Sequence, residues 1–95
     1  MKNSLKRLEN RKDYSEQFKD EKIESIELIC NKTNSSPVTV YGFDGSSVVF
    51  QEGSFIQGNA YNIPFVRLEW DINNNADFFL LITYKKEKKV QMLFS

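Results

Sequence analysis

Apolar and charged residues alternate most regularly between Phe65 and Ile72. The apolar members of this stretch are Val66, Leu68, Trp70 and Ile72, and the charged members between them are Arg67, Glu69 and Asp71. A period of two predicts a β-strand with one buried face and one face in solvent. We expect the chain's single tryptophan to lie on the buried face, because a large indole contributes most to stability when it is removed from water.

The segment 78–85 is almost continuously apolar, which predicts a strand that is covered on both faces. A polar turn at 73–77 separates it from the strand around Trp70. Placing Trp70 opposite Leu80 puts three further pairs on the same face, namely Leu68 with Ile82, Val66 with Tyr84 and Ile72 with Phe78. The same reasoning pairs Ile82 with Met92 and Leu80 with Phe94 across a short loop at 86–88. The last third of the chain is therefore predicted to be a meander.

A hairpin is predicted where two alternating runs, 38–43 and 47–51, flank Asp44-Gly45. This dipeptide favours a type I′ turn, which needs positive φ at both central positions. In that register Tyr41 faces Val48 and Thr39 faces Phe50. For the looser segment that follows, we expect a short strand near Phe55 and then a connecting loop.

The N-terminal segment 1–22 is highly charged and is predicted to be helical, packed on the β domain or extending from it. Asp13 and Glu16 resemble a capping box that starts a fresh helix at Tyr14, so that Tyr14 and Phe18 face the domain. One continuous helix is the alternative, and residues 1–12 are a loosely held arm if the helix breaks. For 23–31 a strand is favoured over a helix, because Ile26, Leu28 and Cys30 alternate with their neighbours.

Together these elements predict a single α+β domain over residues 1–95. An N-terminal helix precedes an antiparallel sheet of about five or six strands, arranged as a meander. The pattern leaves open whether the sheet stays flat or curls into a partly closed barrel. The length of the chain allows one modest core.

Charge is unevenly distributed although the formal net charge is zero. Residues 1–22 carry seven basic and five acidic side chains, 23–77 carry two and seven, and 78–95 carry four and one. The middle of the chain is thus acidic and both ends are basic. Frequent lysine, asparagine and isoleucine with scarce alanine fit an AT-rich bacterial or phage genome.

The absence of histidine removes most familiar catalytic arrangements, including Ser-His and Cys-His pairs and histidine-ligated zinc. Cys30 stands alone in an apolar strand, so we expect a packed core thiol rather than a nucleophile. The chain also has no glycine-rich phosphate loop. We therefore expect a protein that is not an enzyme and that uses no cofactor and no metal.

A cytoplasmic location is expected for three reasons. No apolar run follows the basic start, no stretch reaches the roughly 20 apolar residues of a membrane span, and one cysteine forms no internal disulfide. Sequons begin at Asn31 and Asn34, and we interpret them as polar turn residues.

The acidic middle supplies the leading functional hypothesis. Glu69 and Asp71 project from one strand face, ~7 Å apart by the rise of a strand, and Asp77 lies across the turn. Three carboxylates of this kind also suit Mg²⁺, which is a much weaker hypothesis. The expected surface for a protein partner comprises Glu69, Asp71, Asp77, Glu52 and Asp44. Such a surface fits an inhibitor or accessory factor of a nucleic-acid enzyme or defence system in a bacterium or phage.

The alternative is a small nucleic-acid-binding protein. It uses the N-terminal helix and the lysine-rich hairpin of Lys85, Lys86, Lys88 and Lys89, which lies next to Tyr84 and Phe94. The same lysines also serve to discourage sheet edges from pairing. No membrane partner is expected, and an unpaired sheet edge would permit a homodimer.

Overall fold

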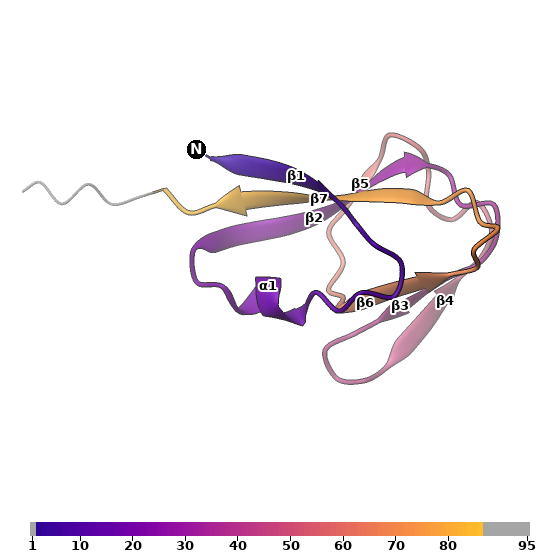
Figure 1. Ribbon diagram of the computed structural model, residues 1–95, viewed down its shortest axis with the longest axis horizontal. Helices are drawn as coiled ribbons and strands as arrows, with labels where there is room; N and C mark the ends of the chain where they lie inside the picture. Colours follow the sequence, from indigo (N-terminus) through magenta and orange to yellow (C-terminus); the bar gives the residue numbers. More distant parts are fainter. Residues whose placement is uncertain (1, 87–95) are drawn as a thin grey trace, which may run out of the picture.

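The computed structural model describes residues 2–86, which form two antiparallel sheets and one short helix. In chain order the elements are β1 (Asn3–Arg7), α1 (Ser15–Lys19), β2 (Ile23–Lys32), β3 (Val38–Tyr41), β4 (Ser47–Phe50), β5 (Ala60–Tyr61), β6 (Arg67–Trp70) and β7 (Asp77–Tyr84). The first sheet has the strand order β1-β7-β2-β5 and the second has the order β4-β3-β6. Figure 1 shows these sheets as two layers. An antiparallel α+β fold is confirmed, and neither sheet closes into a barrel within the described residues.

The predicted N-terminal helix is wrong. Residues Asn3–Arg7 form β1, which pairs along β7 from Asn3 opposite Thr83 to Arg7 opposite Phe79. Helix α1 is only five residues long, and its N-cap is Tyr14, which makes no side-chain capping bond. The predicted capping residue Asp13 precedes it, and its carboxylate accepts the amide of Ser15 at 2.7 Å. A strand forms in spite of helix-favouring residues because pairing with a central strand outweighs intrinsic propensity.

The strand predicted over 23–31 is confirmed as β2. Its inward residues Ile26, Leu28 and Cys30 are all buried. β2 pairs with β7 on one side and with the two-residue strand β5 on the other. It therefore lies inside the four-stranded sheet, where its apolar face contributes directly to the core.

The predicted meander of the last third is wrong, because β6 and β7 belong to different sheets. Trp70 lies opposite Val38 of β3 rather than Leu80. Leu80 lies between Lys6 of β1 and Leu28 of β2. The expected partners Met92 and Phe94 lie outside the described residues.

The hairpin around Asp44-Gly45 is confirmed as β3–β4, with a register one residue from the prediction. Val40 pairs with Val48 and Thr39 with Val49. The amide of Gly42 bonds the carbonyl of Ser46 at 2.9 Å, and Gly45 alone in this loop has positive φ. This is a three-residue loop with a glycine bulge rather than the two-residue type I′ turn.

One hydrophobic core lies between the two sheets. Leu68 of β6 and Phe78, Leu80 and Ile82 of β7 are buried in it, and Trp70 is half-buried against it. Phe55 is buried, but it lies in a loop and not in the predicted short strand. The prediction for Ile72 is wrong, because this side chain is 92% exposed in a turn after β6.

Two of the segments that carry the chain from one sheet to the other are polar, namely 33–37 from β2 to β3 and 71–76 from β6 to β7. The buried side chains of Asn34 and Asn74 fasten these crossings. Both amide nitrogens donate to the carbonyl of Ser36, at 2.9 Å and 3.0 Å. Among residues 2–86, no helix combines the length and apolar character needed to cross a membrane.

Candidate binding surfaces

Glu69 is the one carboxylate of the predicted surface that belongs to β6, and its charge is balanced locally. The hydroxyl of Tyr41 donates to its Oε1 at 3.2 Å. Nε of Arg67 lies 3.0 Å from its Oε2, in an ion pair that is not aligned as a hydrogen bond. The Arg67 guanidinium also lies over the Tyr41 ring, 4.2 Å from its centroid. Glu69 is therefore part of a cation–π and ion-pair cluster that spans the neighbouring strands β3 and β6.

The carboxylate of Asp77 accepts more side-chain hydrogen bonds than that of Glu69. Arg7 bonds both of its carboxylate oxygens, at 2.9 Å and 3.0 Å, and the amide of Asn31 donates to it at 2.8 Å. These bonds, that from Arg7 above all, hold the pKa of Asp77 below its ordinary value. Only 11% of the Asp77 side chain is exposed. Asp77 begins β7, so it belongs to the four-stranded sheet and not to the sheet of Glu69. Within residues 2–86, no three histidine, cysteine, aspartate or glutamate side chains converge as metal ligands.

Asp44 and Glu52 are the two predicted carboxylates that bracket β4. Asp44 lies in the loop before the strand, and Glu52 follows it in an exposed turn. Hydrogen bonds from the Ser46 hydroxyl and amide lower the pKa of Asp44, so its carboxylate is ionised at neutral pH. No lysine or arginine occurs between residues 33 and 66, so both ends of β4 are acidic.

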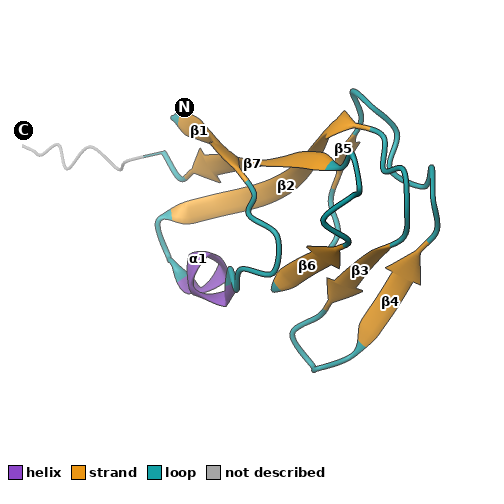
Figure 2. Ribbon diagram, turned by 45° about the vertical axis from the view of Figure 1, so that its right-hand side comes forward, coloured by secondary structure: helices purple, strands orange, loops and turns teal. Residues whose placement is uncertain are grey.

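The outer edge of β4 is open. This strand pairs with β3 alone among the described strands. The Gly42 amide points toward β4, where it bonds Ser46, and the Tyr41 carbonyl points toward β6, where it accepts the amide of Val66. Because backbone groups alternate along an antiparallel strand, the amides and carbonyls of Ser47 and Val49 point away from β3. They face the open side of the three-stranded sheet (Figure 2).

Each face of β4 carries an exposed apolar side chain. Val48 and Val49 point to opposite faces and are 56% and 52% exposed. On the Val48 side lies a shallow groove of about 460 Å³, which is lined by the hairpin, by Ile63 and Pro64, and by Asp44 at the turn. Phe43 adds a third exposed apolar side chain in the hairpin loop, where it is 54% exposed.

The other sheet edges among the described strands are protected. The segment 10–14 covers β6, because the amides of Arg11 and Tyr14 bond the carbonyls of Leu68 and Val66. Strand β1 carries adjacent cationic side chains, and β5 has only two residues. Lysine and short length are common ways to prevent edge pairing. Within the part of the chain that the structure describes, nothing covers the outer edge of β4, and its four residues carry no charge.

Two of the hairpin lysines of the alternative hypothesis lie beside two lysines of the N-terminal segment, which that hypothesis also uses but as a helix. Lys85 and Lys86 line a groove of about 780 Å³ together with Lys2 and Lys22. Lys88 and Lys89 lie outside the described residues, as does Phe94. The sequence prediction does not bring these lysines into one groove, because it makes the N-terminus helical and a helix there would not pair with the end of β7. For β4 the overlooked signal was Val48-Val49, two adjacent apolar residues in a strand whose two faces are therefore both apolar.

Cys30 is a buried thiol in the core, as predicted. Burial raises its pKa above the ordinary value, which favours the unreactive protonated form. The described residues thus offer two exposed surfaces of different character, an apolar strand edge with acidic ends and a groove rich in lysine. Comparison of this chain with protein-family models, with curated proteins and with solved structures gives no match.

Proposed function

We propose that this chain is a non-enzymatic binding protein that takes up an extended segment of a protein partner at the open edge of β4. The observation that supports the proposal is an uncharged strand in which the outward backbone groups of Ser47 and Val49 have no hydrogen-bond partner among residues 2–86. An added strand would satisfy those groups through main-chain hydrogen bonds, which is a common mode of peptide recognition.

The side chains of β4 define what such a partner presents. A partner residue opposite Val48 would share its face and enter the groove beside Ile63 and Pro64. Partner residues opposite Ser47 and Val49 would lie on the other face, where Val49 offers an apolar contact. An apolar residue at the central position of the partner strand is therefore expected.

The acidic residues at the two ends of β4 favour a different protein as the partner over a second copy of this chain. In the symmetric antiparallel pairing that matches Ser47 with Val49, Asp44 of one copy lies opposite Glu52 of the other. Like charges placed opposite each other disfavour that pairing. A partner segment with lysine or arginine near each end would instead complement both carboxylates. This retains Asp44 and Glu52 from the surface predicted from the sequence and leaves Glu69, Asp71 and Asp77 outside it.

Such binding suits an inhibitor or accessory factor of a bacterium or phage, acting on a basic partner such as a nucleic-acid enzyme. A cytoplasmic location remains a prediction from the sequence. Acidic ends on an otherwise apolar strand would speed the encounter with a basic surface and orient the added strand.

The test is an NMR titration of the ¹⁵N-labelled protein with a synthetic peptide in which valine and threonine alternate, flanked by an arginine at each end. We expect the amide signals of Ser47 and Val49 to shift and their hydrogen exchange to slow. Val49→Pro removes one outward donor without touching the β3–β4 ladder, because proline is tolerated at edge positions that face solvent. It is expected to weaken binding about fivefold, for a hydrogen bond of ~1 kcal/mol.

Val49→Thr is the matched control, since it keeps both the β-branch and the amide, and it should bind like the original chain. A peptide with glutamate at both ends should bind more weakly than the arginine peptide, and the difference should shrink in the Asp44→Asn, Glu52→Gln double variant. Shifts confined to other strands, or equal binding by the proline and threonine variants, would refute strand addition at β4. Concentration-dependent self-association with the same amide protection would identify a second copy as the occupant instead.

A further inference from the structure

A lysine-rich groove lies at the end of the four-stranded sheet. Three segments meet there, namely the start of β1, the turn before β2 and the end of β7. The amide of Tyr84 bonds the carbonyl of Lys2 at 2.9 Å, and the amide of Lys85 bonds the carbonyl of Lys22 at 2.9 Å. The backbones that carry these lysines are thus held side by side by the sheet itself.

The charge of this groove is strongly one-sided. Lys2, Lys22, Lys85 and Lys86 line it, with Glu21 as the one acidic side chain among the lining residues. In the part of the chain from residue 2 to residue 86, none of these four lysines takes part in an ion pair. Four neighbouring ammonium groups repel one another, so an anion placed among them is attracted by all four.

We infer that this groove binds neighbouring phosphate groups, such as those of a single-stranded nucleic acid or of a free polyphosphate. Lysine supplies a flexible point charge for each phosphate, and its contacts are independent of base sequence. The volume of about 780 Å³ leaves room for more than one phosphate. Tyr84 is half-buried and packs against the core, and it contributes the one aromatic side chain among the residues that line the groove.

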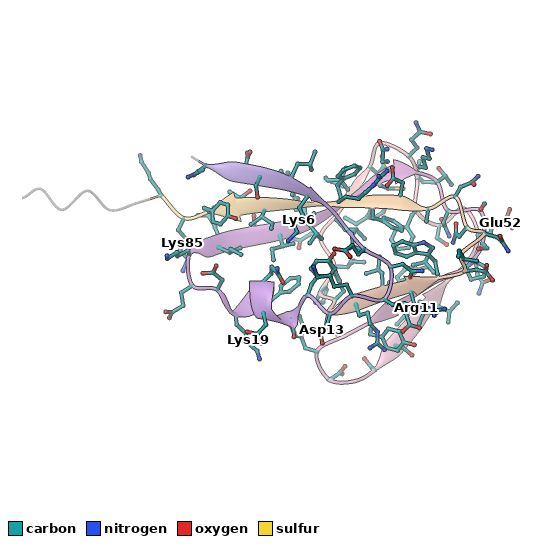
Figure 3. All side chains as sticks on the ribbon, in the orientation of Figure 1. Lys6, Arg11, Asp13, Lys19, Glu52 and Lys85 are labelled. Carbon is teal, nitrogen blue, oxygen red and sulfur yellow. The ribbon has the colours of Figure 1, made fainter. Side chains whose placement is uncertain are left out.

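This site is independent of strand addition at β4. Lys85 and Glu52 lie at opposite ends of the described part of the chain in Figure 3, and Glu52 is two residues beyond the end of β4. A partner strand on β4 would therefore leave the lysine groove accessible. The result of the binding experiment at one surface therefore leaves the proposal for the other surface unaffected.

The experiment measures fluorescence anisotropy of a labelled ten-nucleotide oligothymidine with the full chain at several low salt concentrations. For two to three phosphate contacts on a single strand, the logarithm of the association constant should fall with that of the salt concentration with a slope of about −1.4 to −2.1. The Lys22→Glu, Lys85→Glu double variant should bind at least about tenfold more weakly. Unlabelled tripolyphosphate serves as the competitor that carries phosphates without bases.

The matched control is the Arg11→Glu, Lys12→Glu double variant, which changes the net charge by the same amount. Arg11 lies far from Lys85 in Figure 3. This control should retain most of the binding, and the Trp70 emission of both variants reports whether they are folded. Competition by tripolyphosphate at similar phosphate concentration identifies free polyphosphate as a sufficient ligand, whereas weak competition identifies the nucleic-acid strand. No binding at low salt, or an equal loss in both double variants, would overturn the inference.

Discussion

The side-chain amide of Asn10 hydrogen-bonds both backbone groups of Trp70. Its Nδ2 donates to the Trp70 carbonyl at 2.8 Å, and its Oδ1 accepts from the Trp70 amide at 3.0 Å. A single side chain thus takes the place that one residue of a neighbouring strand would occupy. With the Arg11 and Tyr14 amides further along, it completes the cover over the free side of β6.

Replacing Asn10 with alanine should therefore destabilise the protein. Two partly buried backbone groups would lose their partners, and the free energy of unfolding should fall by ~1–3 kcal/mol. Urea unfolding followed by Trp70 fluorescence measures this loss. Asn62→Ala is the control, because Asn62 is exposed and should change stability by less than ~0.5 kcal/mol. Equal stability of the two variants would show that the Asn10 bonds contribute nothing.

The N-terminal segment shows where local sequence reasoning fails. Residues Asn3–Arg7 contain good helix formers and a single apolar side chain, so nothing in them indicates a strand. Their conformation is set by β7, a strand more than 70 residues away in sequence, whose free side needs a partner. Edge strands carry little alternation because water reaches both faces. The short-range part of the prediction, a helix beginning near Asp13, was close to the observed α1.

The bidentate ion pair of Arg7 and Asp77 should make the free energy of unfolding depend on pH in the acidic range. The pKa of Asp77 is lower in the folded protein than in the unfolded chain, because Arg7 and Asn31 bond its carboxylate. The unfolded chain therefore takes up the proton first as the pH falls. This contribution to stability is present above the unfolded pKa and is lost as the pH drops through the folded pKa.

Arg7→Gln should raise the pKa of Asp77 toward its ordinary value and reduce this acid-dependent loss. Carboxyl NMR titration of Asp77 measures the pKa, and urea unfolding at several pH values measures the stability. Arg7→Lys is the matched control, since it keeps the charge but loses the two-point bond, so the pKa should lie between those of the other two chains. Ordinary titration of Asp77 in the unaltered protein would contradict the pairing.

Alternation predicted the faces of the strands but not their partners. Leu68 was correctly assigned to the core, yet its predicted partner Ile82 lies in the other sheet. Any shift by two residues preserves the agreement of faces, so matching apolar pairs does not identify a neighbour. The sequence predicts a hairpin turn at the polar residues 73–77, but the segment 71–76 carries the chain from one sheet to the other. Hairpin loops and inter-sheet crossings have the same polar composition, and only long-range contacts separate them.

Asn34 is the centre of the first of these crossings and should be essential for stability. Its side chain is 1% exposed. Its Nδ2 donates to the carbonyl of Gln51 at 3.0 Å, and its Oδ1 accepts the amide of Phe55 at 3.0 Å. Asn34→Ala would leave these buried groups unpaired and should cost at least ~2 kcal/mol in a urea unfolding experiment.

Asn34→Asp tests the contribution of the Nδ2 donor, because it keeps the Oδ1 acceptor for the Phe55 amide and replaces the amide nitrogen with a second oxygen. It should destabilise the protein at neutral pH, where a carboxylate oxygen would face the carbonyls of Ser36 and Gln51. Asn75→Ala changes an exposed neighbour of the second crossing and should have little effect. A small cost for both Asn34 variants would mean that the crossing tolerates the loss of this network.

Leu68 and Ile72 share one face in the alternating pattern, but the structure separates them. Leu68 is fully buried in β6, whereas Ile72 is 92% exposed in the turn that follows. Leu68→Ala should therefore lower the free energy of unfolding by ~2–5 kcal/mol. Ile72→Ala removes a side chain that is already in water, so its effect should stay within ~0.5 kcal/mol. Both variants are followed by Trp70 fluorescence in urea, and comparable losses would place Ile72 in the core and extend β6 beyond Trp70.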